Sequence, residues 1–131
     1  MKAYTDIEQS KKLAEILPLE SADCFWDYDD LQKYHRINWF EEGFNKESQL
    51  RLNENNVRAW SLAALIEEIP EIINFDDDES DYALEMLKEN NLYYLSYGNP
   101  LEHSKIEIEP QEYFVDACVD MIDKLHELKM L

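Results

Sequence analysis

The spacing of apolar residues predicts a helix near the beginning of this 131-residue chain. Across residues 6–17 apolar side chains recur every three or four positions, which places them on one helix face. Thr5 and Glu8 have the spacing of a capping box, in which each side chain accepts a hydrogen bond from a free backbone amide at the helix start. Pro18 cannot continue a helix, so the segment is expected to end before it.

Two later segments have the same helical pattern. The first, residues 60–70, contains Ser61, a residue suited to the N-cap, and its leucines and isoleucines share one face. Residues 111–128 follow Pro110, which the first turn of a helix tolerates. This last segment carries an uninterrupted apolar stripe formed by Phe114, Cys118, Met121, Ile122, Leu125 and Leu128.

Alternating apolar and polar residues predict strands over residues 22–29, 34–40 and 105–109. The first two are separated by a turn that begins at Asp29-Asp30, which favours a hairpin. The connection over residues 41–57 is long and polar, and a short additional strand at 49–52 is an alternative within it.

Residues 82–88 fit either a helix or a strand. Their composition favours a helix, but residues 92–97 are strand-like, and Asn90-Asn91 stands between the two segments. Asparagine tolerates the positive φ of a tight hairpin turn. We therefore favour a hairpin over 82–97, and a helix at 82–88 stays the alternative.

These elements predict a single α+β domain. The length matches one domain, and with 45% apolar residues the chain has enough material for a core. We expect an antiparallel sheet of about four or five strands, packed with three helices at the N-terminus, in the middle and at the C-terminus.

The charge of the chain is strongly negative and unevenly distributed. Thirty acidic and 12 basic residues give a net charge of −18, of which residues 1–66 contribute −4 and residues 67–131 contribute −14. Such a field repels nucleic acid and anionic membranes and attracts basic partners. No apolar run approaches the ~18 residues of a membrane span. The polar N-terminal segment and two isolated cysteines, Cys24 and Cys118, favour a cytoplasmic protein.

Two groups of acidic residues form the candidate partner-binding face. One is a stripe along the last predicted helix, and the other is a loop before the predicted hairpin. A solvated helix face is the simpler interpretation of the stripe, and the alternative is an array that imitates a phosphate backbone. The residues are Asp76, Asp77, Asp78, Glu79 and Asp81 in the loop, and Glu112, Asp116, Asp120, Asp123 and Glu127 in the stripe.

The acidic loop does not fit an EF-hand. A register that starts at Asp76 places Asp81 where glycine is required and Leu87 where glutamate is required. The register from Asp77 fails in the same way. A weak cation site stays a minor alternative, and no cofactor or metal is predicted.

No motif for catalysis is present in the sequence. His35, His103 and His126 lack the spacing of metal ligands. Neither cysteine has a neighbouring base, and no nucleophile elbow or glycine-rich phosphate loop occurs. We therefore expect no enzyme activity and assign no catalytic residue.

Three stretches of the chain, residues 1–18, 60–65 and 124–131, resemble a family of small uncharacterised proteins of gut bacteria and of their phages and mobile elements. The resemblance implies no catalytic residues, because the family has no assigned activity. It implies a mobile-element setting, in which small acidic proteins often inhibit host defence.

The sequence thus predicts a non-catalytic acidic module that binds a basic protein surface. In its sharpest form the module imitates nucleic acid and inhibits a basic defence or DNA- or RNA-processing protein. The alternative is a small adaptor or oligomerising domain whose charge serves solubility.

Overall fold

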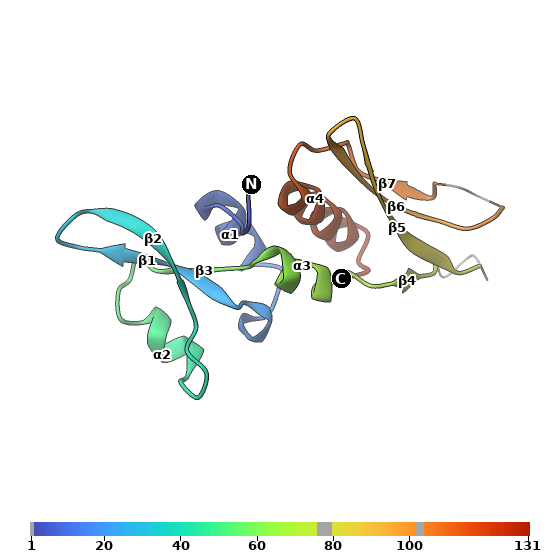
Figure 1. The fold of residues 1–131 in the computed structure, drawn as a ribbon. Coiled ribbons are helices and arrows are strands. Elements are labelled where there is room, and N and C mark those ends of the chain that lie inside the picture. Colours follow the sequence, from blue (N-terminus) through green and yellow to red (C-terminus); the bar gives the residue numbers. More distant parts are fainter. Residues whose placement is uncertain (1, 76–79, 102–103) are drawn as a thin grey trace.

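The computed structural model describes residues 2–75, 80–101 and 104–131. Over these ranges the chain forms four α-helices, one 3₁₀ turn and seven strands in two antiparallel sheets, which confirms the α+β class. Figure 1 shows one sheet at each end of the molecule, with α1 and α3 between them. No helix in the described part of the chain is long and apolar enough to cross a membrane.

The first sheet has the order β2-β1-β3 and is antiparallel throughout. It consists of β1 (Cys24–Asp29), β2 (Tyr34–Trp39) and β3 (Val57–Ala59). The predicted hairpin of the first two strands is confirmed, and Lys33 closes its turn with φ 58°.

The alternative of a short strand at residues 49–52 is wrong. This region begins within α2 (Lys46–Leu50) and ends in a turn. The Asn45 side chain accepts a hydrogen bond from the backbone of Ser48, and this N-cap favours a helix in a segment that is otherwise mostly polar.

The second sheet has the order β4-β5-β6-β7. Its strands are β4 (Ile72–Ile73), β5 (Tyr82–Glu89), β6 (Leu92–Gly98) and β7 (Ile106–Glu107). The favoured hairpin over residues 82–97 is confirmed as β5 and β6, and Asn90 and Asn91 take the positive φ values that its turn requires, 54° and 63°.

The strands therefore divide between two sheets, where the sequence predicted one. The reason lies at the end of β3, where Ser61 caps α3 (Leu62–Glu68) and stops the strand. The helix then carries the chain to β4, which forms the edge of a new sheet instead of extending the old one.

The N-terminal helix, α1 (Ile7–Leu13), begins with a capping box shifted by one residue from the predicted pair. Asp6 Oδ1 accepts from the backbone of Gln9 at 2.8 Å, and the Gln9 side chain accepts from the backbone of Asp6 at 3.1 Å. The predicted cap, Thr5, is instead fully buried and shares a hydrogen bond with Ser10. The helix also ends earlier than predicted and is followed by the 3₁₀ turn η1 (Leu19–Ser21).

The C-terminal helix, α4 (Phe114–Glu127), begins three residues later than predicted. Gln111 exchanges two backbone hydrogen bonds with Tyr93 of β6, at 2.7 and 3.0 Å, and is therefore held in an extended conformation. Ser61 does cap α3 as predicted, because its Oγ accepts from the backbone of Ala64 at 3.2 Å.

The main core lies where α4 meets α1, α3 and the second sheet (Figure 1). The buried face of α4 carries most of the apolar residues that the sequence placed in its stripe. Fully buried side chains of this core include Leu13, Trp60, Leu65, Tyr97, Met121, Ile122 and Leu125.

Candidate functional site

A hollow of about 280 Å³ lies between β7 and α4 and is lined mainly by carboxylates. We call it the acidic groove. Five carboxylate side chains and a single ammonium group line it, so it carries a strongly negative field in the half of the chain with the greater negative charge. Its residues are Glu107, Ile108, Glu109, Asp120, Asp123, Lys124 and Glu127.

One wall of the acidic groove comes from β7 and the residues after it. Ile106 pairs with Tyr97 of β6 and is only 4% exposed, so the alternation of the strand turns Glu107 outward. Ile108 continues the pairing by donating its amide to Leu95 at 3.3 Å. Glu109 follows and is also exposed.

The other wall comes from α4. Asp120, Asp123 and Glu127 are spaced three and four residues apart, which places them along one side of the helix. The side-chain amide of Gln111 donates to Asp120 Oδ2 at 2.6 Å, and Lys12 of α1 pairs with Asp123 Oδ2 at 2.9 Å. Glu127, at the end of this row, is exposed.

Burial raises the pKa of the Asp120 carboxyl, and the nearby charges of Asp116 and Asp123 raise it further. The hydrogen bond from Gln111 acts in the opposite direction. The hydrogen bond to Asp123 raises the pKa of Lys12, and the field of Asp120 and Glu127 adds to this effect. The charge contributions to both shifts have the sign expected of a negative potential around the acidic groove, and burial is the larger cause for Asp120.

Asp116 has a structural role. Its Oδ1 accepts hydrogen bonds from Lys2 Nζ and from Gln9 Nε2, both at 2.7 Å. These contacts fasten the N-terminal segment and α1 to the first turn of α4. The predicted acidic stripe is thus partly covered by the chain's own lysines.

The remaining predicted residues of the partner-binding face lie apart from the acidic groove. Glu112 is exposed and lines a different hollow, together with Lys2 and Lys88. Asp81 is exposed directly before β5. Asp76, Asp77, Asp78 and Glu79 lie outside the described residues.

Glu107 and Glu109 were absent from the predicted face. The alternation of Ile106 and Ile108 with these two glutamates did indicate a strand with a charged outer side. The sequence pattern did not show that β7 pairs with β6. This pairing brings the charged side of β7 next to α4.

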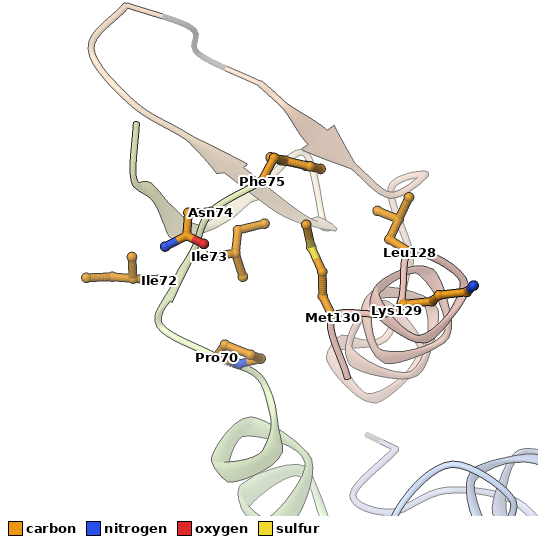
Figure 2. Close-up of a pocket in the computed structure, with 8 residues that line it drawn as sticks. All are labelled: Pro70, Ile72, Ile73, Asn74, Phe75, Leu128, Lys129 and Met130. Atoms are coloured by element: carbon orange, nitrogen blue, oxygen red, sulfur yellow. The ribbon is translucent and has the colours of Figure 1, made fainter. Parts of the chain in front are cut away.

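A second hollow, of about 530 Å³, is lined by apolar side chains together with Asn74 and Lys129. Figure 2 shows Ile73, Phe75 and Met130 around it, whereas Ile72 and Asn74 extend from the opposite side of their strand. None of the described residues that line it carries a carboxylate, which distinguishes it chemically from the acidic groove.

The two cysteines are buried and chemically quiet. Burial raises the pKa of the Cys118 thiol to about 12 and raises that of Cys24 as well, with the Asp23 charge adding to the effect. Since the thiolate is the reactive form, neither is activated as a nucleophile. Among the described residues, no three His, Cys, Asp or Glu side chains are arranged to hold a metal ion.

Comparisons with protein-family models, with curated proteins and with solved structures found no match to this chain.

Proposed function

We propose that this chain is a non-catalytic binding module of the cytoplasm that docks its acidic half on the basic surface of a nucleic-acid-binding protein. The observation that carries the proposal is the acidic groove, in which carboxylates from two elements face a common hollow and the ammonium groups of Lys124 and Lys12 offset only part of their charge. A basic side chain entering the groove gains several charge-assisted hydrogen bonds.

The carboxylates of α4 alone are too widely spaced to imitate a phosphate backbone, and the acidic groove adds further negative charge beside them. Along α4 alone the acids recur about every 6 Å, at 1.5 Å per residue, whereas duplex DNA carries a charge about every 1.7 Å of its axis. Glu107 and Glu109 add a second row of carboxylates beside the first. Two rows on either side of a hollow resemble the two strands of a groove, so we infer inhibition by occupation of the partner's nucleic-acid site.

The first test is capture of the partner on the tagged chain, with washes at ~0.1 M and ~0.5 M salt, between which screening of exposed charges rises steeply. Support requires a basic nucleic-acid-binding protein that is released at the higher salt and is displaced by added nucleic acid. A partner that resists salt would contradict the proposal.

A matched pair of charge reversals locates the surface. Glu107→Lys with Glu109→Lys changes the acidic groove, whereas Glu41→Lys with Glu42→Lys makes the same change in net charge at an exposed loop beside the first sheet. Capture should be lost in the first variant and kept in the second. Equal loss in both would mean that net charge, not the acidic groove, attracts the partner.

A second candidate function is an adaptor that binds through apolar surface, with charge serving solubility. The hollow of Figure 2 favours it, because Ile73, Phe75 and Met130 surround it and Leu128 in its lining is 39% exposed. An adaptor's binding should be insensitive to salt and should be lost on Met130→Asp, while the groove variant would leave it intact.

A further inference from the structure

The outer edge of β2 has hydrogen-bonding groups directed away from its own sheet. Phe40 donates its amide to Asp23 at 3.2 Å, just beyond the end of the β1–β2 ladder. Hydrogen-bonded and non-hydrogen-bonded pairs alternate along an antiparallel ladder. By this alternation His35, Ile37 and Trp39 are the non-hydrogen-bonded positions, and their N–H and C=O groups point away from β1.

This edge is long, regular and uncovered. All six residues from Tyr34 to Trp39 pair with β1 in one continuous register, without a bulge and without proline. Among the described strands β2 pairs with β1 alone, and Figure 1 shows it on the outer side of the first sheet. Exposed edges of this kind are usually shielded by prolines, bulges or covering elements, because they recruit other strands.

The edge strand exposes two large aromatic side chains. Trp39 is 53% exposed and Tyr34 is 43% exposed. Ile37 lies opposite Trp26, which in turn lies opposite Val57, so that an apolar row crosses the sheet and ends at the open edge. A further strand beside β2 would prolong this row.

We propose that a second copy of this chain pairs with β2 antiparallel about a two-fold axis, which joins the two first sheets into one continuous sheet. Centring the axis on Ile37 brings His35, Ile37 and Trp39 opposite Trp39, Ile37 and His35 of the second copy. The outward backbone groups of all three residues are then used.

The rival register, centred on Arg36, is disfavoured by charge. It places two arginines directly opposite each other, which destabilises a strand pair. With the axis on Ile37, Arg36 instead faces Asn38 of the second copy. The strand is therefore complementary to itself in one register, which is the requirement for a two-fold interface.

The charge distribution favours a second copy at this edge over the other end of the molecule. Residues 23–59, which contain the first sheet, hold eight acids and five bases, a balance of −3, whereas residues 67–131 carry −14. Two copies thus meet through the less acidic half of the chain and hold their more acidic halves apart. This proposal does not depend on a role for the acidic groove.

Salt separates this association from docking through the acidic groove. Two copies of net charge −18 repel each other, so screening should increase the dimer fraction, whereas it should weaken binding to a basic partner. Sedimentation of the whole chain over a roughly hundredfold range of concentration should show a dimer that grows with concentration and with salt.

Single cysteine variants test the register. Hydrogen-bonded antiparallel residues lie about 5.5 Å apart between Cα atoms, within the range that a disulfide spans. Under mild oxidation Ile37→Cys should therefore form a covalent dimer, and Arg36→Cys should not. The native Cys24 and Cys118 are fully buried and leave the assay clear.

Ile37→Lys should abolish the dimer while leaving the circular dichroism of the monomer unchanged, because it places two ammonium groups opposite each other. A chain that is monomeric at every concentration and salt, without cross-linking by Ile37→Cys, would overturn the proposal. Cross-linking through Arg36→Cys instead, or an extended segment of another protein bound to β2, would also overturn it.

Discussion

The two sheets of this protein are built from similar hairpins but differ in how they are covered and charged. The second sheet packs α4 against one face, and its residues Leu95 and Tyr97 belong to the main core. In the first sheet Cys24, Phe25 and Ala59 are buried, while β2 is largely exposed. The better packed half also has the greater negative charge. Its packing therefore offsets the repulsion between its carboxylates, which is greatest there.

The comparison teaches that the packing that stabilises this half and the binding function proposed for it use different surfaces. The inner face of α4 supplies apolar burial, whereas its outer side contributes carboxylates to the acidic groove. The first sheet has the opposite character, with little core and a nearly neutral edge. Four experiments with substituted chains test this division.

The substitution with the largest expected effect removes the junction between the two sheets. Trp60 is fully buried at the end of β3, and its indole donates to Ser21 Oγ at 2.9 Å. Trp60→Ala should lower the free energy of unfolding by about 3–5 kcal/mol. In urea, fluorescence from Trp26 and Trp39 reports the first sheet, and far-ultraviolet circular dichroism reports α4. Both transitions should shift together; a shift in fluorescence alone would show that the two sheets unfold independently.

Asp23 links the start of the first sheet to the start of α3. Its carboxylate accepts hydrogen bonds from the backbone of Ser61 at 2.9 Å and from the Ser61 hydroxyl. Asp23→Ala leaves these partly buried donors unpaired, so a loss of about 1–3 kcal/mol is expected in urea unfolding. Ser61→Ala keeps the backbone bond and loses the N-cap, and it should cost about 0.5–2 kcal/mol. An unchanged free energy of unfolding in Asp23→Ala would mean that this link does not stabilise the fold.

A matched pair of valine substitutions compares the two regions directly. Val119 on α4 is 6% exposed, whereas Val57 on β3 is half-buried. Each change to alanine deletes the same two methyl groups. Val119→Ala should cost about 2 kcal/mol and Val57→Ala about 1 kcal/mol or less, because less area is buried at Val57. Equal losses of unfolding free energy in urea would show that the two valines are packed equally well.

The sequence predicted the elements that are governed by local chemistry. The hairpin at Asn90 and Asn91 was identified because few residues tolerate its backbone angles. The Ser61 cap was identified for a similar reason. The boundaries of α1 and α4 shifted because neighbours compete for the same groups: Thr5 is drawn into a buried contact with Ser10, and Gln111 is drawn into pairing with β6.

The pairing of strands that are far apart in the chain could not be predicted from local patterns. This pairing determines both the number of sheets and the shape of the acidic groove. Nothing local distinguishes one sheet from two, because that depends on which edge each short strand meets. The acidic stripe on α4 was visible as a helical repeat. Local patterns did not show that Lys2 and Lys12 form ion pairs with this stripe, or that Glu107 lines the same hollow. Both depend on contacts between residues far apart in the chain.

The smallest expected effect has the opposite sign and concerns the acidic groove itself. Asp120 is half-buried beside other acids, and its pKa is raised in the folded state by burial and by the charges of Asp116 and Asp123. A carboxyl with a raised pKa binds its proton more readily when folded. Its contribution to stability therefore decreases as the pH rises from its ordinary value of 3.8 through the folded pKa.

Asp120→Asn keeps an oxygen that accepts from Gln111 and removes the charge, so near pH 7 it should raise the free energy of unfolding by less than about 1 kcal/mol, since solvent screens a half-exposed carboxylate. The gain should vanish at acidic pH, where Asp120 is protonated. Asp116→Asn is the control and should destabilise, because it weakens the contacts with Lys2 and Gln9. A loss of stability in Asp120→Asn at neutral pH would mean that the charge supports the fold. A gain, together with weaker capture of a basic partner, would mean that Asp120 serves binding at a cost to stability, as the division between the two faces of α4 requires.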